Sequence, residues 1–355
     1  MRHDGQSGPG SVLLTGGAGY LGSHIAVELL MAGWAVTVLD NLRNSSPVAI
    51  ERAQELGGGP ISLHVGDIRD AAALDRALAE ARPDSVIHLA GLKAVEESIR
   101  RPLAYYDNNV VGTATLLEAM ERHDVRDIVF SSSATVYGEP ERIPLTEDCR
   151  LGPVNPYGRT KLHIEEMLRD LVGAGGGWRA ILLRYFNPVG AHPSGRLGED
   201  PAGIPTNLLP IVMQVAVGRR DRVQVFGDDY PTADGTCIRD YIHVVDLARG
   251  HVAALDALER IDGCQTLNLG TGHGSSVRQV IQAASGAAGR DLPFEMAPRR
   301  PGDVAECWAD PSQAEALLGW RSRLTLADAC RDAWTWQSTN PDGYPEPAAP
   351  PLTST

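Results

Sequence analysis

Tyr157 and Lys161 lie four residues apart and form the pair in this sequence best suited to moving a proton. Asn155 suits the N-cap of a helix and Pro156 its first position, so the sequence predicts a helix that presents both side chains on one face. An ammonium group beside a phenol favours the phenolate and lowers a pKa that is about 10 when unperturbed. Bringing that pKa near neutrality takes roughly 4 kcal/mol. Because Lys161 alone does not supply this much, we expect a cationic cofactor beside the pair.

A glycine-rich turn supplies a place for such a cofactor. Residues 11–15 predict a strand, and residues 16–22 then read Gly-Gly-Ala-Gly-Tyr-Leu-Gly before a helical pattern begins. Strand, glycine turn and helix together form the fingerprint that holds the pyrophosphate of a dinucleotide at a helix N-terminus. The spacing fits two versions of this fingerprint, one counted from Gly17 and one from Gly16, and both continue through Gly19 and Gly22.

Acidic residues end the next two predicted strands. Asp40 can accept hydrogen bonds from an adenosine ribose and repels a 2′-phosphate, which favours NAD over NADP. Arg43 is a weaker signal in the opposite direction, because it could pair with that phosphate. Asp67 and Ile68 could frame an adenine, but Asp67 could equally cap the helix that follows it.

The alternation of strands and helices continues to about residue 186 and predicts an α/β fold with a Rossmann-type, doubly wound parallel sheet. Ligands gather at the carboxyl ends of such strands. The residues at these ends are Gly16, Asp40, Asp67, Gly91, Ser133 and Tyr185. One helix is expected from about Pro102 to Arg122. The shorter elements beyond residue 187 predict a smaller C-terminal α+β substrate domain.

The expected domain organisation has four parts. They are a flexible N-terminus (1–10), an NAD-binding Rossmann domain (11–186) to which segments near 236–270 return, a substrate-binding domain (187–340) and a Pro-rich tail (341–355).

The composition excludes several other classes of protein. The net charge of −13 argues against nucleic acid or an anionic membrane as a partner. No apolar stretch is long enough to span a membrane, and the polar start lacks the pattern of a signal peptide. The five cysteines are scattered without a Cys-x-x-Cys pair, so neither a disulfide framework nor a metal site is expected. We therefore expect a cytoplasmic protein.

With these features assembled, the chain resembles the extended short-chain dehydrogenase/reductase family and, within it, the UDP-glucose 4-epimerases. The resemblance runs from about Ser11 to Pro345. The segments that carry it are 16–23, 40–42, 90–95, 131–138, 184–188, 239–243 and the Trp-x-Trp-Gln at 334–337.

The resemblance implies an isomerase with bound NAD. In that family Tyr157 is the base that removes the proton of the sugar 4-hydroxyl, and Ser133 and Lys161 complete the triad. Hydride then passes from C4 to NAD. The 4-keto sugar swings about its pyrophosphate link and takes the hydride back on its opposite face. NAD is regenerated in each turnover, so no external oxidant is needed.

The resemblance also implies two sets of binding residues. The expected cofactor contacts are Gly16, Gly19, Tyr20, Leu21, Gly22, Asp40, Asn41, Asn44, Ser45, Asp67, Ile68, Leu89, Ala90, Gly91, Lys93, Asn108, Ser133, Tyr157, Lys161, Tyr185 and Phe186. The expected substrate contacts are Asn187, Asn207, Leu208, Gln224, Phe226, Arg239, Arg300, Asp303 and Cys307. Arg239 and Arg300 suit the pyrophosphate, because guanidinium groups bind phosphate in a bidentate manner. Asp303 suits a ribose hydroxyl.

Two departures bear on specificity. Ala134 follows Ser133, where the sugar dehydratases of this family carry an acidic pair, which argues against dehydration. Cys307 stands where epimerases restricted to plain hexoses have a bulky Tyr. A pocket widened in this way predicts that UDP-N-acetylhexosamines are also substrates, although Cys307 could instead be a small core residue.

Several alternatives remain open at this stage. A UDP-glucuronate or UDP-pentose epimerase or decarboxylase would share the core, as would a ketone reductase with exchanging NAD(P)H. A non-catalytic NAD-sensing module is a more remote alternative. By the same resemblance, the protein is expected to be a homodimer that pairs helices near 102–122 and 156–172.

Overall fold

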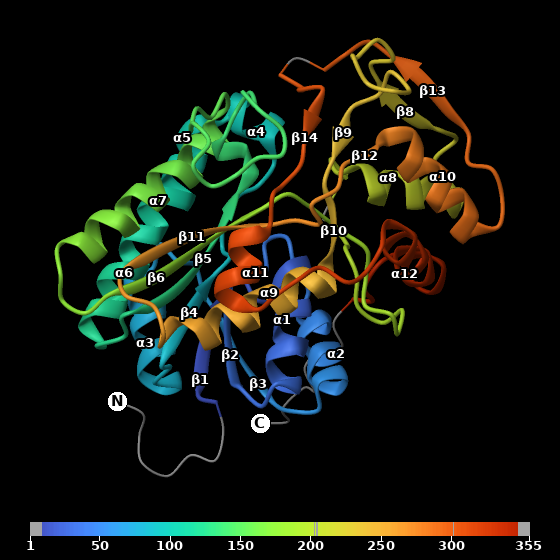
Figure 1. The fold of residues 1–355 in the computed structure, drawn as a ribbon. Helices are drawn as coiled ribbons and strands as arrows, with labels where there is room; N and C mark the ends of the chain where they lie inside the picture. Colours follow the sequence, from blue (N-terminus) through green and yellow to red (C-terminus); the bar gives the residue numbers. More distant parts are fainter. Residues whose placement is uncertain (1–8, 202, 204, 301, 347–355) are drawn as a thin grey trace, which may run out of the picture.

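The computed structural model describes residues 9–201, 203, 205–300 and 302–346, and its largest element is a seven-stranded parallel sheet (Figure 1). The strand order is β11-β6-β5-β4-β1-β2-β3. The bounds are β1 Ser11–Thr15, β2 Ala35–Asp40, β3 Ile61–Val65, β4 Ser85–His88, β5 Asp127–Ser133, β6 Arg179–Tyr185 and β11 Cys264–Leu269. The order reverses at β1 and β4, which is where such sheets bind ligands at their carboxyl ends. The predicted Rossmann-type sheet is confirmed.

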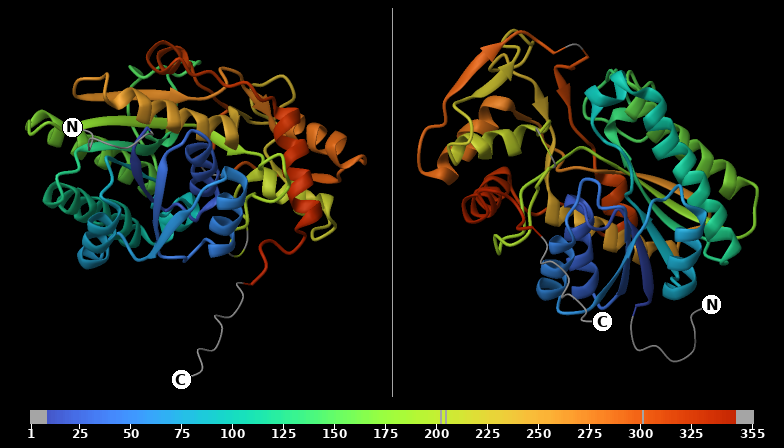
Figure 2. Two further views of the ribbon diagram at one scale, coloured as in Figure 1. Left: turned by 90° about the horizontal axis from the view of Figure 1, so that it is seen from below. Right: turned by 180° about the vertical axis from the view of Figure 1, so that it is seen from behind.

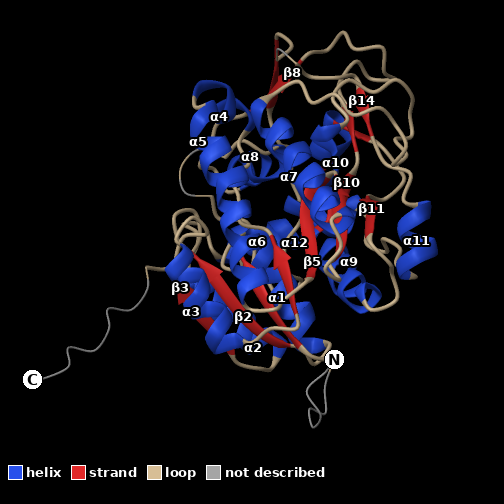
Figure 3. Cartoon of the chain, turned by 90° about the vertical axis from the view of Figure 1, so that its left-hand side faces the viewer, coloured by secondary structure: helices blue, strands red, loops and turns tan. Residues whose placement is uncertain are grey.

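Helices cover both faces of this sheet, and the strands are accordingly continuous apolar runs rather than alternating ones (Figure 3). One face packs against α1 Tyr20–Met31, α2 Pro47–Gly57, α9 Val244–Leu258 and α11 Ser312–Leu318. The other face packs against α3 Ala71–Ala81, α6 Gly112–Arg122 and α7 Pro156–Gly173.

The helix expected over residues 102–122 is more complex than predicted. It consists of α5 Pro102–Tyr105, a π-helical turn Tyr106–Val111 and α6, with the short helix α4 Val95–Arg100 before it. A π-helical turn widens the helix locally and often occurs at functional sites. Here the turn carries the buried amides of Asn108 and Asn109.

A smaller domain with its own core lies to one side of the large sheet (Figure 2). Its helices are α8 Leu208–Ala216, α10 Val277–Ala288 and α12 Leu326–Thr339. Its strand pairs are β7 Asn187–Val189 with β10 Tyr241–His243, β8 Val223–Phe226 with β13 Phe294–Ala297, and β9 Ile238–Arg239 with both β12 Ser275–Ser276 and β14 Glu306–Cys307. The chain enters this domain after β6, and α9 and β11 return to the large sheet.

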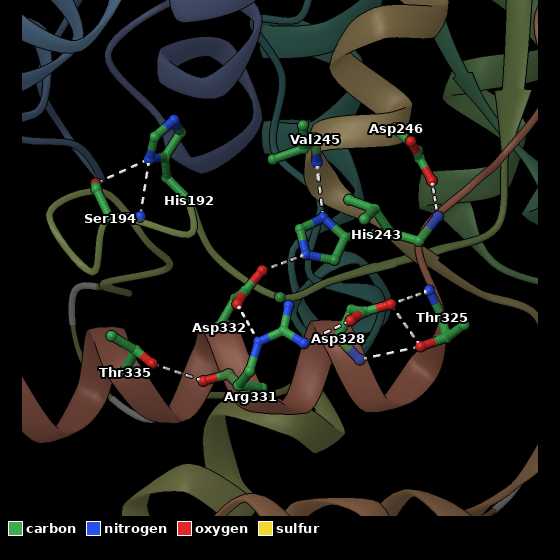
Figure 4. Close-up of polar contacts among 12 residues, drawn as sticks. His192, Ser194, His243, Val245, Asp246, Thr325, Asp328, Arg331, Asp332 and Thr335 are labelled. Carbon is green, nitrogen blue, oxygen red and sulfur yellow. Dashed lines mark hydrogen bonds and ion pairs between the residues drawn. The ribbon is translucent and has the colours of Figure 1, made fainter.

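A buried polar contact joins the two parts (Figure 4). His243 caps α9, and its Nδ1 accepts the amide of Val245 at 3.1 Å, so the proton of the neutral ring lies on Nε2. That Nε2 faces the Asp332 carboxylate on α12 at 3.2 Å, and Arg331 donates to the same carboxylate at 3.0 Å. The start of α9 and the middle of α12 are therefore held together.

The chain after α12 differs from the expected tail. Tyr344 packs against Trp336, with ring centroids 4.8 Å apart, and its backbone amide donates to Asp200 at 2.8 Å. The tail prediction is therefore wrong for residues 341–346, because an aromatic side chain among prolines and glycine has a surface to pack on. Residues 1–8 and 347–355 lie outside the described part of the chain. Among the described residues, no helix is long and apolar enough to cross a membrane, and no cluster of His, Cys, Asp and Glu side chains could hold a metal ion.

Candidate active site

The reactive pair lies on the first two turns of α7, as the sequence predicts. The Asn155 side chain accepts the amide of Gly158 at 2.8 Å, and Pro156 occupies the first helical position. Tyr157 and Lys161 follow one turn apart, and α7 packs beside β5, whose last residue is Ser133.

Lys161 is almost completely buried, with 5% of its surface exposed. Its Nζ donates to the backbone carbonyl of Ser131 at 2.7 Å and lies 4.8 Å from the centroid of the Phe130 ring. Burial lowers the pKa of Lys161 to about 8, and the negative charge of Glu165 opposes this effect. The ammonium is therefore held in place by the end of β5, at a position where burial disfavours its charge.

Burial also decides the state of Tyr157, in the direction opposite to the sequence prediction. Burial raises the pKa of its phenol, and a hydrogen bond with Ser133 only partly offsets this rise. Ser133 Oγ also accepts from the amide and the hydroxyl of Thr135, at 3.2 and 3.0 Å, so it serves the backbone as well as Tyr157.

Behind this pair lies a buried ionic cluster that the sequence analysis did not identify. Arg184 donates twice to the Glu165 carboxylate, at 2.9 and 2.6 Å, and Ser132 donates to it at 2.5 Å. Burial favours the neutral form of Glu165, but the hydrogen bonds and charge of Arg184 outweigh it and lower the pKa of the carboxyl. The signal in the sequence was the spacing, because Glu165 is four residues after Lys161 on the same helix face.

The glycine turn leaves no room for a side chain at Gly16 or Gly22. Gly16 has φ +73°, and a Cβ there would lie 2.7 Å from the backbone nitrogen of Ala90. A Cβ at Gly22 would lie 2.5 Å from the carbonyl oxygen of Gly16. Gly19 begins α1 and provides no side-chain cap, so the first amides of the helix can meet an anion.

The acidic residues after β2 and β3 have different surroundings. Asp40 is buried and accepts from the amides of Ala18 and Leu42, at 3.0 and 2.9 Å, and from Ser45 Oγ at 2.8 Å. It thus faces the glycine turn. Asn44 lies on the same loop.

Asp67 is instead bound to Asn41 at 3.0 Å and to Arg69 at 2.8 Å, and these hydrogen bonds hold the pKa of its carboxyl well below the usual range. The alternative that Asp67 caps the next helix is wrong, because Asp70 does so. Ile68 is buried and lies under Gly112.

The loop after β4 connects the glycine turn to Lys161. Leu89 and Ala90 lie against Thr15 and Gly16, and a Cβ at Gly91 would lie 3.8 Å from Lys161 Nζ. Asn108 donates to the neighbouring Asn109, whose amide bonds both the backbone of Leu92 and the hydroxyl of Thr160. Asn109, which the sequence analysis missed, therefore fixes this loop to α7.

The remaining expected cofactor residues lie around the same crevice. Tyr20 and Leu21 open α1, and the Tyr20 hydroxyl donates to the carbonyl of Gly190 at 2.7 Å. Tyr185 ends β6 and shares a hydrogen bond with the Ser131 hydroxyl, while Phe186 is buried directly after it. Lys93 pairs with Glu199 at 3.3 Å.

The expected substrate residues form two groups in the smaller domain. In one, the Arg300 guanidinium lies 3.9 Å from the centroid of the Phe226 ring, and Gln224 on the same strand bonds Glu295. In the other, Arg239 donates to the carbonyl of Val304 at 2.8 Å and faces Asp303 at 3.5 Å.

Cys307 pairs with Arg239 through the strands β14 and β9, and burial raises the pKa of its thiol to about 11. Asn187 is held through its amide to Asp240, next to Arg239 in sequence. Asn207 stands at the N-cap position of α8, but its side chain donates to Glu199 at 3.1 Å instead of capping the helix. Leu208 packs against the core of this domain.

Comparison with known proteins gives a consistent set of matches. Residues 12–270 match the model of the NAD dependent epimerase/dehydratase family. A UDP-glucose 4-epimerase of Bacillus subtilis is 55% identical over 334 residues, covering 94% of this chain and 98% of that protein. The Mus musculus UDP-glucose 4-epimerase is 54% identical over 340 residues, covering 94% and 98%. The crystal structure of the Bifidobacterium longum UDP-glucose 4-epimerase with NAD+ and UDP has a TM-score of 0.91 and 53% identity, covering 94% of this chain and 100% of that one.

Proposed function

This chain belongs to the NAD-dependent epimerase/dehydratase family, and we propose that it interconverts UDP-glucose and UDP-galactose by inverting the configuration at C4 of the sugar. The observation that carries this proposal is the continuity from the glycine turn through Ala90 and Gly91 to Lys161. The proposed dinucleotide site then lies beside Lys161, one helical turn from Tyr157, which can exchange a proton. The arrangement suits oxidation and reduction of one sugar hydroxyl.

The residues around the glycine turn fit NAD. A Cβ at Gly16 or Gly22 would strike backbone atoms, so the turn leaves its amides open to the pyrophosphate. The buried Asp40 carboxylate can accept hydrogen bonds from an adenosine ribose, and its charge repels a 2′-phosphate. The glycine turn and Asp40 would hold NAD, which would supply a hydride acceptor and donor for C4 of the sugar.

Tyr157 is the proposed proton acceptor and donor at the 4-hydroxyl, and Ser133 hydrogen-bonds the same oxygen. The buried phenol has a raised pKa in the chain alone, so Tyr157 holds its proton until positive charge is brought beside it. Lys161 contributes its positive charge and its N–H donors, and the backbone carbonyl of Ser131 holds its Nζ in place.

The smaller domain is proposed to hold the UDP part of the substrate. The flat Arg300–Phe226 pair suits a base, and Arg300 and Arg239 suit the two phosphates. Asp303, close to Arg239, suits a ribose hydroxyl. Asn187, Asn207, Leu208 and Gln224 complete the proposed sugar and uridine contacts.

We further propose that UDP-N-acetylglucosamine and UDP-N-acetylgalactosamine are substrates. The support is Cys307, whose small thiol adjoins Arg239 across β9 and β14. We expect Cys307→Tyr to abolish N-acetylhexosamine turnover while glucose turnover persists. If both activities are lost, or neither, Cys307 does not set this specificity.

A homodimer is proposed through the face that α4, α5 and α7 form. Apolar side chains are exposed there, and Leu103 is 82% exposed and Ile99 62%. Burying such side chains against a second copy would stabilise the pair. Light scattering should give twice the chain mass for the wild type and the single mass for Leu103→Asp, whereas equal masses would argue against this face.

The central test is to incubate purified protein with UDP-galactose and no added NAD, and to follow UDP-glucose by chromatography. We expect interconversion by the wild type without net consumption of NADH, and its loss in Tyr157→Phe. UDP-glucuronate and UDP-pentoses serve as parallel substrates. Turnover of these alone would support the alternative epimerase or decarboxylase, and turnover of none would refute the proposal.

A further inference from the structure

Glu199 lies between one expected cofactor residue and one expected substrate residue, and the mechanism above does not use it. Its carboxylate accepts from Lys93 Nζ at 3.3 Å and from Asn207 Nδ2 at 3.1 Å. Lys93 belongs to the loop after β4 of the large sheet, and Asn207 begins α8 of the smaller domain. One carboxylate therefore joins the two sides of the crevice.

The contacts also fix which atoms the two partners present. Because the Asn207 side-chain nitrogen donates to Glu199, its carbonyl oxygen points away and can accept from a ligand. The Lys93 ammonium has three donors, of which Glu199 engages one. The side chain of Glu199 is 11% exposed and that of Lys93 52%, so Glu199 is the fixed partner and Lys93 the one that is held.

Trp336 on α12 and Tyr344 after it clamp the backbone around Glu199. The Glu199 carbonyl accepts from the Trp336 indole at 3.3 Å, and the Tyr344 hydroxyl bonds both the amide and the carbonyl of Gly198, at 3.2 and 3.1 Å. A Cβ at Gly198 would lie 2.3 Å from the Trp336 ring, so the loop packs directly on it.

This clamp in turn rests on the larger domain. The Arg52 guanidinium on α2 lies 5.7 Å from the Trp336 ring centroid and 5.2 Å from that of Tyr344, and it donates to Asn340 at 2.9 Å. Figure 1 shows the chain leaving α12 towards α2. The loop that carries Glu199 is thus anchored to both domains rather than free.

We propose that Glu199 is a positioning residue that sets Lys93 and Asn207 for ligand binding, and that the Trp336–Tyr344 clamp sets Glu199. The proposal rests on the function proposed above, since it assigns the two sides of the crevice to NAD and to the UDP-sugar. Under this proposal residues 341–346, which were expected to form a tail, help to position Glu199.

The test compares Glu199→Gln, Lys93→Met, the double variant and a matched control, Glu315→Gln, which removes the ion pair between Glu315 on α11 and Arg321. We expect Glu199→Gln to lower kcat/KM for UDP-galactose about tenfold, mainly through KM, and to weaken UDP binding in calorimetry by a similar factor. The double variant should lose less than the product of the two single losses, because both act on one pair. Glu315→Gln should match the wild type, and all variants should unfold at similar temperatures.

Two results would overturn the proposal: kcat/KM of Glu199→Gln within twofold of the wild type, or losses that simply multiply in the double variant. Tyr344→Phe tests the clamp, because it removes the hydrogen bonds to Gly198 while keeping the ring. It should raise KM about threefold, and an unchanged KM would refute the clamp. If the wild type fails to epimerise, the proposed function fails, and UDP calorimetry still decides whether Glu199 positions a ligand contact.

Discussion

Replacing Glu165 by Gln should destabilise the protein strongly, because it leaves a buried guanidinium without its counter-charge. Arg184 is 1% exposed and Glu165 is fully buried, and the two share two hydrogen bonds of 2.9 and 2.6 Å. Breaking one partner of such a pair costs about 3–5 kcal/mol. For a chain of 355 residues that corresponds to a fall in Tm of about 4–7 °C, since the entropy of unfolding is about 2.1 cal/mol/K per residue.

The same reasoning predicts that removing both charges costs less than removing one. In Glu165→Leu/Arg184→Met no buried charge remains unpaired, because the other partner of Glu165, Arg169, has a side chain that is 36% exposed. Apolar side chains of similar volume fill the site, so most of the lost stability should return. Thermal unfolding followed by circular dichroism measures both variants. Glu315→Gln, which breaks an exposed ion pair, should change the free energy of unfolding by less than about 1 kcal/mol. A double variant less stable than Glu165→Gln would refute the argument.

Two further predictions concern the cofactor turn and the buried lysine. Gly22→Ala should weaken NAD binding by tenfold or more, because the added Cβ would lie 2.5 Å from the Gly16 carbonyl oxygen and overpacking costs about 1–3 kcal/mol. The NAD that stays bound after gel filtration, measured by absorbance, tests this prediction. Full retention of NAD by the variant would contradict it. Burial lowers the pKa of Lys161 from 10.5 to about 8, so the folded state releases this proton first and stability should rise with pH between these values, by up to about 3 kcal/mol. Denaturant titrations of the wild type and Lys161→Met at pH 7.5 and 10.5 should show this rise in the wild type alone, and parallel curves would exclude it.

Features that depend only on neighbouring residues could be predicted from the sequence. Asn155 and Pro156 start α7 because capping and fixed backbone angles act within one turn, and the glycine turn forms because only glycine fits the backbone there. Continuous apolar strands separated by helices specified the parallel sheet. The positions of Tyr157 and Lys161 on one helix face could be predicted because residues four apart lie on the same side of a helix.

The tertiary structure decided what depends on burial and on partners distant in sequence. The pKa of Tyr157 is raised because burial outweighs its hydrogen bond with Ser133, and Lys161 Nζ donates to the backbone carbonyl of Ser131. Glu199 meets Lys93 only because the loop that carries it folds across the crevice. Tyr344 packs near Gly198 because α12 returns the chain to α2. Electrostatic free energies depend on the local dielectric and on three-dimensional distance, and a linear pattern contains neither.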